Sequence, residues 1–259
     1  MARVRYAARR EDLSRQEPAR SETGTTDAWS LSLLASYETD PEVVKVVLPR
    51  PLEPTGEAIV NVNISQVEMA RGARFGAADV TVPARHVSRV GRYCLALPMT
   101  SESAVIGGRE TFGEPKKVAE IHLERRGEEI HGTVTRHGIT WLEMRGRVVE
   151  ALPTPPPEET LDFYFKFLIS PDGKGFDNDP ALVYCRREYP IRKLERVEGE
   201  IILRDSDFDP VADLPVRRIR SIVLADRQCH QQAEIVDRVP GEWIAPFAHQ
   251  RYDQFSWKR

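Results

Sequence analysis

The sequence predicts a mainly β fold of the α+β type, in which many short strands form a sandwich or barrel. Three observations support this expectation. Segments rich in strand-forming residues recur along the chain, glycine turns separate several of them, and helical patterns are few. Many short strands in this arrangement are typical of sandwiches and barrels. A chain of 259 residues can bury a core of this kind without disulfide or metal support.

The expected strands are short segments of β-branched, aromatic or alternating residues. They lie over residues 58–64, 79–82, 92–97, 118–124, 129–135, 139–149, 163–169, 181–185 and 197–203. In the fourth of them, Ala119, Ile121 and Leu123 alternate with polar residues, which predicts a strand with one buried face. Gly127 and Gly138 fall between neighbouring segments and predict tight turns.

Two helices are expected. Asp40 is a good N-terminal cap and Pro41 suits the first turn, so the apolar residues that follow should form a short helix. This helix must end before Pro49, because proline cannot continue it. A second short helix is predicted over residues 225–236.

The chain is expected to form one β-rich domain with a polar extension at each end. Residues 1–28 are rich in arginine and acidic residues and predict a polar N-terminal arm. Residues 29–240 make the domain, and residues 241–259 make a C-terminal tail. The proline-rich residues 154–157 predict a stiff extended spacer, and strands are expected on both sides of it, so we interpret it as a crossover inside the domain.

The composition argues against several classes of protein. Thirty-seven basic residues against 40 acidic ones give a net charge of −3, which does not favour a nucleic-acid partner. No apolar run approaches the ~20 residues of a membrane helix. Three dispersed cysteines without a CxxC pair favour a reducing, cytoplasmic location. The six histidines form no HxH or HExxH pair, so no metal site is expected.

One segment contains residues suited to covalent chemistry: Pro115 is followed by two adjacent lysines, Lys116 and Lys117. The simplest interpretation is a charged turn that enters a surface strand. The functional alternative is a nucleophilic lysine, which attacks a carbonyl only when it is uncharged. At a reference pKa of about 10.4, only about 0.04% of a lysine is neutral at pH 7. Burial and a neighbouring cation both lower that pKa, and a lysine pair in a dry barrel mouth combines the two effects.

The pattern Gly-Arg-Glu-x-x-x-x-Pro-Lys-Lys, from Gly108 to Lys117, resembles the signature of the acetoacetate decarboxylase family. Acetoacetate decarboxylase is itself a known case of a lysine activated by its surroundings. Weaker similarities in the same order occur over residues 39–53 and 213–222. The resemblance covers roughly residues 30–240.

The resemblance implies a cone-shaped antiparallel β-barrel with a flanking sheet and a few short helices. It implies that Lys116 forms the Schiff base and that Lys117 is the neighbour that perturbs it. Arg109 and Glu110 match the conserved-looking pair of the signature, which we expect to form a salt bridge under the site, and Glu114 is expected to support the site. No cofactor is implied, because the lysine itself serves as the electron sink. The expected partner is a small keto-acid substrate, and the family forms homo-oligomers.

The sequence departs from the family pattern where the family decarboxylase carries charged residues. Ala77 aligns with one family glutamate, residues 61–63 align with a second, and Ser30 lies near the position of a family arginine. Acetoacetate itself is therefore in question as the substrate. Four charged residues could compensate: Glu68, Arg71, Arg74 and Glu114.

Three functions follow as hypotheses. The first is a carbon–carbon lyase that decarboxylates a β-keto acid through an imine on Lys116. The second is an aldolase-dehydratase that acts on pyruvate and an aldehyde, which the missing glutamate and arginine favour. The third is a barrel that binds a small ligand without catalysis. Strand alternation places Lys117, not Lys116, on the apolar side of Ala119, so the choice of Lys116 rests on the family resemblance.

Overall fold

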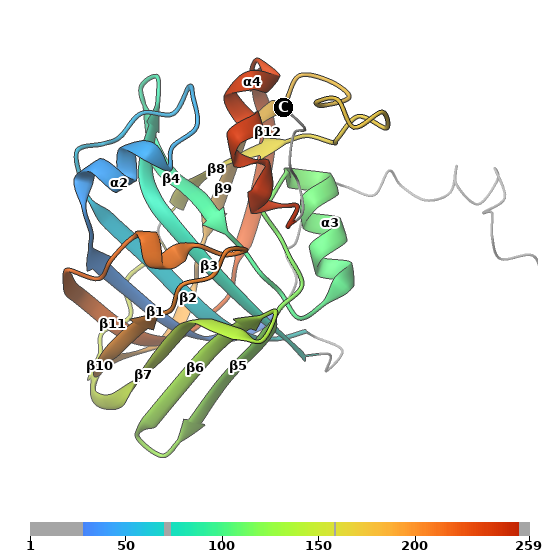
Figure 1. Ribbon diagram of the computed structural model, residues 1–259. Helices are drawn as coiled ribbons and strands as arrows, with labels where there is room; N and C mark the ends of the chain where they lie inside the picture. The colour runs from blue at the N-terminus through green and yellow to red at the C-terminus, as the bar shows by residue number, and fades with distance from the viewer. Residues whose placement is uncertain (1–27, 70–73, 158, 254–259) are drawn as a thin grey trace, which may run out of the picture.

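The computed structural model describes residues 28–69, 74–157 and 159–253, and in these residues twelve strands form one hydrogen-bonded sheet (Figure 1). The spatial order is β12-β9-β8-β4-β3-β2-β1-β11-β10-β7-β6-β5, and all neighbours are antiparallel except β4 and β8. The strands are β1 (Trp29–Glu38), β2 (Ile59–Glu68), β3 (Arg74–His86), β4 (Arg89–Ala96), β5 (Glu120–Arg126), β6 (Glu129–Arg136), β7 (Ile139–Leu152), β8 (Glu159–Lys166), β9 (Ala181–Glu188), β10 (Ile191–Leu203), β11 (Arg218–Arg227) and β12 (His230–Arg238). The helices are α2 (Pro41–Val46), α3 (Glu102–Phe112), α4 (Gly241–Ile244), η1 (Val211–Asp213) and η2 (Ala245–Gln250). The mainly β prediction is confirmed.

The expected closed barrel is confirmed only in part, because the sheet order has two ends, β12 and β5. Single bridges from Met99 to Ala77 and to Val118 connect β3 with the segment that leads into β5. A second contact joins two strand connections: Gln228 N, between β11 and β12, donates to Pro190 O, between β9 and β10, at 2.9 Å. Strands β11, β1, β2, β3, β4, β8 and β9 therefore curve around a common interior.

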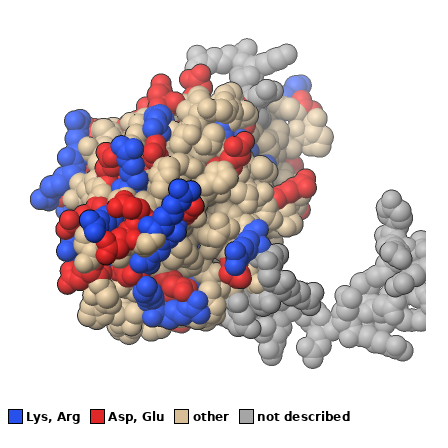
Figure 2. All heavy atoms as spheres, turned by 90° about the horizontal axis from the view of Figure 1, so that it is seen from below, with Lys and Arg blue, Asp and Glu red and all other residues tan. Residues whose placement is uncertain are grey.

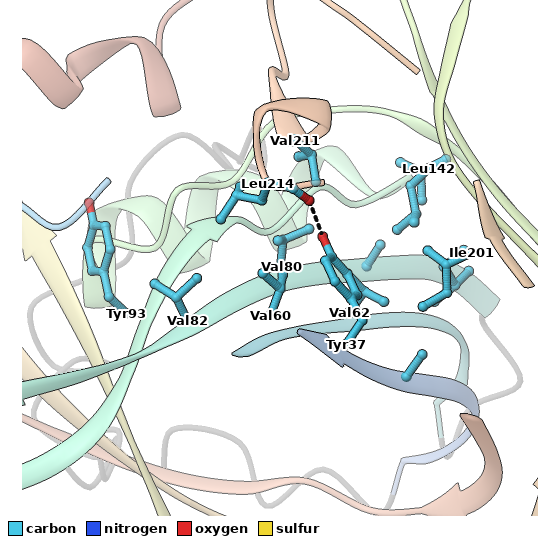
Figure 3. Close-up of a cluster of buried hydrophobic side chains, with 14 of the residues drawn as sticks. Tyr37, Val60, Val62, Val80, Val82, Tyr93, Leu142, Ile201, Val211 and Leu214 are labelled. Carbon is cyan, nitrogen blue, oxygen red and sulfur yellow. Dashed lines mark hydrogen bonds between the residues drawn. The ribbon is translucent and has the colours of Figure 1, made fainter. Parts of the chain in front are cut away.

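One face of these strands carries the apolar core. Figure 3 shows Val62 of β2, Val80 of β3 and Leu142 of β7, which belong to one cluster of buried side chains. Tyr37 lies in the same cluster and donates its hydroxyl hydrogen to Leu214 O at 3.1 Å. This contact attaches the loop that contains η1 to strand β1.

The opposite face of the same strands is polar and also buried. Ser32 on β1 and Asn63 and Ser65 on β2 are each less than a tenth exposed. Ser65 Oγ lies 2.8 Å from both Ser32 Oγ and Asn63 Oδ1, and Asn63 Nδ2 donates to Asp79 at 2.7 Å. Buried polar groups need such partners, so the face is held as a hydrogen-bonded network. The lysine segment lies against this polar interior.

The first predicted helix is confirmed. Asp40 accepts a hydrogen bond from Glu42 N at 3.0 Å, Pro41 occupies the first turn, and α2 ends at Val46, before Pro49. The predicted turns at glycine are also found, because β5, β6 and β7 are successive antiparallel neighbours joined at Gly127 and Gly138. Both glycines have positive φ, which residues with a side chain rarely adopt.

The second predicted helix is wrong. Residues 218–227 form β11 between β1 and β10, and residues 230–238 form β12 against β9. Strand pairing in the folded chain outweighs the weak local helical preference of this segment. Helix α3 was not predicted from the sequence. Gly107 and Gly108 lie inside it, and each glycine disfavours helix by about 1 kcal/mol.

The surface carries mixed charges. Figure 2 shows acidic and basic side chains interspersed over much of the visible face. Cross-strand pairs between β7 and β10 contribute to this pattern, with Arg145 Nε 2.6 Å from Glu200 and Arg196 Nε 3.0 Å from Glu150. Among the described helices, none combines the length and the apolar character that a membrane crossing requires.

The two ends of the chain differ in what the structure describes. Apart from Ala28, the predicted N-terminal arm over residues 1–28 lies outside the described residues. Of the predicted tail over residues 241–259, the structure describes residues 241–253. This part contains α4 and η2, and it returns to the lysine segment at Arg251 and Asp253.

Candidate active site

The two lysines lie in a segment outside helix and strand that follows α3. The helix begins after the Ser101 cap and ends at Gly113, whose φ of 81° is a left-handed conformation that glycine adopts readily. Beyond this turn, Met99 N donates to Lys117 O at 2.9 Å, so the segment runs beside the strand connection at residues 97–99. Lys116 N donates to Glu114 O at 2.8 Å, which closes a tight turn at Pro115. Lys116 and Lys117 have different surroundings: Lys116 pairs with Glu114, and Lys117 pairs with Asp253.

The Lys116 amine is buried against a carboxylate. The side chain is 9% exposed, and Nζ lies 2.7 Å from Glu114 Oε2. Gly108 of α3 packs directly on this pair, because a methyl group at Gly108 would collide with Glu114 Oε2 and lie 2.5 Å from Lys116 Nζ. The Lys116 amine is therefore sheltered from bulk water.

Glu114 begins a chain of ion pairs across the polar interior. Its Oε1 lies 2.5 Å from Arg187 Nη2 on β9, and Arg187 Nε lies 3.1 Å from Asp162 Oδ2 on β8. Asp162 Oδ1 in turn lies 2.7 Å from Arg92 Nη2 on β4. The chain runs from Lys116 to Arg92 with alternating charges. Three cations against two carboxylates leave one positive charge unbalanced within it.

Burial and charge act in opposite directions on Glu114. Burial raises the pKa of its carboxyl group, but the charges of Lys116 and Arg187 outweigh this effect, so the pKa lies below its ordinary value. Burial raises the pKa of Tyr164 and of Cys94 well above their ordinary values. Glu114 is therefore ionised at neutral pH, whereas the hydroxyl and thiol groups near it are neutral.

Lys117 points away from Glu114, and its positive charge is paired there with carboxylates. Its Nζ donates to Phe208 O at 2.8 Å and lies 2.8 Å from Asp253 Oδ1 and 3.6 Å from Asp209 Oδ1. Arg136 pairs with the same two carboxylates, at 2.7 Å from Asp209 and 2.5 Å from Asp253. Two buried cations and two carboxylates thus tie the lysine segment to the C-terminal segment.

Two cavities lie near these groups. A cavity of about 330 Å³ lies beside Lys117, with a mainly apolar wall that includes Val46, Leu95, Pro98, Val211 and Phe247. A smaller cavity of about 180 Å³ lies on the polar face of the strands, and its wall includes Asn61, Asn63, Asp79, Arg92, Tyr189 and Arg227. Either space is large enough for a small organic molecule. Within the ranges that the structure describes, no group of three or more His, Cys, Asp or Glu side chains is arranged to hold a metal ion.

The Arg-Glu pair of the signature does not form the expected salt bridge. Arg109 stacks over the Tyr252 ring at 4.8 Å, while Glu110 is exposed on the outer side of α3. Both residues are described, and no ion pair joins them, so this expectation is wrong. Arg109 instead contributes through its backbone, because its carbonyl accepts a hydrogen bond from Arg251 Nη2 at 3.0 Å.

The structure describes two of the positions where the family residues are missing. Ala77 is buried, and the carboxylate beside Lys116 comes from Glu114 of the lysine segment. Directly opposite Ser30 on the neighbouring strand β11 lies Arg227, whose Nε donates to Ser32 Oγ at 3.2 Å. A guanidinium group is therefore present one strand away from Ser30.

Sequence reasoning missed two site residues and considered two that lie elsewhere. Asp162 was missed, although its position between Leu161 and Phe163 in an apolar strand segment is a usable signal. Arg187 was also missed, and its place in the charged run of residues 186–188 gives no such signal. Glu68 and Arg74 pair with each other at 3.1 Å in an exposed position. Arg71 lies outside the described residues.

The sequence matches the family model described as acetoacetate decarboxylase over residues 16–237. The acetoacetate decarboxylase of Burkholderia multivorans is 31% identical over 196 residues, which cover 72% of this chain and 77% of the relative. That of Paraburkholderia phytofirmans is 25% identical over 192 residues, which cover 72% of this chain and 75% of the relative.

Solved structures share the fold at low identity. Acetoacetate decarboxylase from Legionella pneumophila has a TM-score of 0.71 at 17% identity, covering 92% of this chain and 99% of that one. The enduracididine biosynthesis enzyme MppR, complexed with the condensation product of pyruvate and imidazole 4-carboxaldehyde, has a TM-score of 0.68 at 14% identity and covers 80% and 87%. These proteins define a class of strand-rich enzymes. The chain belongs to the acetoacetate decarboxylase family and is an enzyme of the lyase class.

Proposed function

We propose that this lyase forms an imine between Lys116 and a keto acid and decarboxylates an acetoacetate-like β-keto acid. The observation that carries the proposal is the buried Lys116 Nζ, 2.7 Å from the Glu114 carboxylate. This amine lies in the segment that resembles the Schiff-base signature, inside the part of the chain that matches the family. Residues 29–240 would then form the catalytic domain.

The charge of the interior favours an acidic substrate. The ion-pair chain from Lys116 to Arg92 carries one unbalanced positive charge. Asp79 and Arg227 add one charge of each sign at the adjoining 180 Å³ cavity, so counting both leaves the surplus unchanged. An unbalanced buried charge is costly, and a substrate carboxylate would neutralise it. A monocarboxylic keto acid therefore suits this interior.

The proposed reaction uses the lysine as the electron sink. The neutral amine attacks the ketone carbon, and the carbinolamine loses water to give a protonated imine. When the carbon–carbon bond to the carboxylate breaks and carbon dioxide leaves, its electron pair forms a C=C bond while the C=N pair returns to nitrogen. The enamine carbon then takes up a proton, and water hydrolyses the imine to release the ketone and the amine.

An aldolase-dehydratase that acts on pyruvate and an aldehyde is the second candidate. Its support is the absence of a carboxylate at Ala77 and the fold likeness to MppR, whose structure contains a pyruvate condensation product. In this reaction the pyruvate enamine attacks the aldehyde instead of a proton, and the adduct then loses water.

Trapping with borohydride tests imine formation. The protein is incubated with acetoacetate or with pyruvate, reduced, and analysed by mass spectrometry with peptide mapping. We expect a stable adduct on Lys116. Acetone and carbon dioxide as products would support decarboxylation, and a condensation product from pyruvate and aldehyde would support the aldolase. A folded protein that gives no adduct with any keto acid would favour a ligand-binding barrel and contradict the proposal.

Matched variants of the two lysines test which amine reacts. Lys116→Arg should fold but lose turnover by at least about 10³-fold, because a guanidinium group is not a nucleophile at neutral pH. Lys117→Met should lower activity more moderately. Since Lys117 pairs with Asp253 and Asp209 on the other side of the segment, we propose that it supports the site by anchoring it. An adduct on Lys117 in the larger cavity, with full turnover in Lys116→Arg, would reverse the assignment.

We also propose a cytoplasmic homo-oligomer. The described cysteines are free, and Cys94 and Cys185 are buried as thiols, which suits a reducing compartment. Strand β12 forms one end of the sheet, and Ile235 on it is 55% exposed, so this edge offers surface to a second copy. Light scattering coupled to size-exclusion chromatography checks the assembly: a monomer at micromolar concentration would contradict this proposal.

A further inference from the structure

The Glu114 carboxylate bridges the amine and a guanidinium group. It is 1% exposed, with Oε2 at 2.7 Å from Lys116 Nζ and Oε1 at 2.5 Å from Arg187 Nη2. Glu114 and Lys116 flank Pro115, and Lys116 N donates to Glu114 O at 2.8 Å, so a tight turn brings the two residues together. A carboxylate at this distance can exchange a proton directly with the lysine nitrogen.

Arg187 is itself held from two directions. Its Nε lies 3.1 Å from Asp162 Oδ2, and its Nη2 donates to Tyr164 Oη at 3.0 Å. Asp162 is fixed in turn by Arg92 Nε, which donates to Oδ1 at 2.8 Å. The guanidinium group is therefore oriented before substrate enters, and it holds one oxygen of Glu114 while the other faces the amine.

We propose that Glu114 is the proton-transfer residue of the Lys116 site and that Arg187 is the positioning residue that directs the Glu114 carboxylate at Nζ. This inference rests on the imine-forming function proposed above. It identifies an acid–base group that lies within the signature segment itself, and not at position 77.

Glu114 can carry the proton transfers of the reaction, with one proton taken from water in each turnover. A proton passes from the Lys116 ammonium to Glu114, which leaves a neutral amine and a carboxylic acid. The amine attacks the ketone, and a proton of the newly bonded nitrogen passes to the alkoxide, which gives a neutral carbinolamine. Glu114 gives its proton to the carbinolamine hydroxyl, which leaves as water, so Glu114 is again a carboxylate. It then takes up a proton from water and, after loss of carbon dioxide, passes this proton to the enamine carbon. Loss of charge on Lys116 removes an influence that lowers the pKa of Glu114, so the carboxylate becomes more basic as the reaction needs it.

Glu114→Gln tests the proton-transfer role. The amide keeps the size of the side chain but accepts no proton, so we expect turnover to fall by about 10²–10⁴-fold. The reduced adduct on Lys116 should still form on long incubation, and Glu114→Asp should recover part of the turnover. Turnover at the wild-type level in Glu114→Gln would overturn this inference. Absence of any adduct in the wild type would instead contradict the imine-forming function.

The pH dependence distinguishes acid–base chemistry from a structural role. In the wild type, kcat/KM should fall at low pH as Glu114 is protonated, and this fall forms the acid limb of the pH profile. Glu114→Gln should remove the acid limb. Arg187→Met should move it to higher pH, because loss of a nearby cation raises the pKa of Glu114. An acid limb unchanged in both variants would contradict the assignment.

Other groups that face Glu114 are not expected to produce this limb. Lys116 is retained in Glu114→Gln, so a limb that this amine produced would remain in that variant. Asp162 acts on Glu114 through Arg187. Arg251, whose Nε donates to Glu114 O at 3.5 Å, stays charged, because burial lowers its pKa only to about 10. Burial raises the pKa of Tyr164 and Cys94 well above their ordinary values. It also raises the pKa of Cys185 to about 11, so these three groups stay neutral across the measured range.

Arg186 provides a matched control for the positioning residue. It is adjacent to Arg187 on β9, but its side chain is 48% exposed and pairs with Glu234 on the surface. Arg186→Met should retain wild-type kcat and pH profile, whereas Arg187→Met should lower kcat by about tenfold or more and Arg187→Lys should restore part of it. If Arg187→Met does not fold, Tyr164→Phe removes one partner of the guanidinium group and should give a smaller shift in the same direction. Equal profiles for the Arg186 and Arg187 variants would overturn the positioning role.

Discussion

Two adjacent glycines in α3 differ sharply in what surrounds them. A methyl group at Gly108 would collide with Glu114 Oε2 and lie 2.5 Å from Lys116 Nζ, whereas one at Gly107 would meet no atom within 4 Å. Gly108→Ala should therefore displace the amine and the carboxylate, and we expect turnover to fall at least about tenfold, since small misplacements of reacting groups are costly. Steady-state kinetics with circular dichroism checks this result.

Gly107→Ala is the internal control for that prediction. Because alanine favours helix over glycine by about 1 kcal/mol, this variant should keep its activity and gain a little stability. Equal activities of the two alanine variants would show that the close approach of α3 is not needed for the chemistry.

At the residue scale, the sequence names candidate site residues only as far as the signature extends. Lys116 and Glu114 lie together in this one segment, and the family resemblance pointed to both as candidates. Arg187 and Asp162 come from β9 and β8, and only the three-dimensional pairing of these strands with the lysine segment brings them together. Strand alternation alone does not choose between the lysines, because it says which side each occupies but not which side holds the carboxylate.

At the scale of elements, Tyr37 joins strand β1 to the loop that carries η1. Its side chain is fully buried and its hydroxyl donates to Leu214 O at 3.1 Å. Tyr37→Phe keeps the ring but leaves that carbonyl without its donor, so the free energy of unfolding should fall by about 1–2 kcal/mol. Urea unfolding measures the change, and an unaltered midpoint with an unaltered slope would contradict it.

The elements that the sequence predicted well are those whose signals are local. Helix α2 has a cap, an initial proline and a terminating proline, and the hairpin turns have glycines with positive φ. Helix α3 and strand β12 were not predicted, because α3 contains two glycines and β12 is defined by its pairing with β9. The curvature of the strands around a polar interior depends on contacts between segments far apart in the sequence, which explains why the barrel prediction holds only in part.

At the scale of the whole molecule, Asp253 fastens the C-terminal segment to the lysine segment. Although burial raises the pKa of Asp253, hydrogen bonds from Arg136, Lys117 and His137 outweigh it and hold that pKa well below its ordinary value. A carboxyl group with a lowered folded-state pKa stabilises the fold above its unfolded pKa of about 3.9 and loses this contribution as the pH falls.

Asp253→Asn should therefore lower the free energy of unfolding at pH 7 by about 1–2 kcal/mol, because charge-assisted hydrogen bonds are lost. The difference from the wild type should shrink as the pH falls below about 4. Thermal unfolding over a pH series measures both effects, with the exposed Asp177→Asn as control. A constant difference at all pH values would show that the carboxylate charge is not responsible.

The opposite orientation of the two adjacent lysines has a consequence for insertions and deletions. Removing Pro115 alone would place Lys117, and no longer Lys116, two positions after Glu114. Deletion of one codon would then put Lys117, which borders the larger apolar cavity, in the sequence position relative to Glu114 that Lys116 now holds. A doubled lysine thus gives this scaffold two alternative nucleophile placements that are a single indel apart.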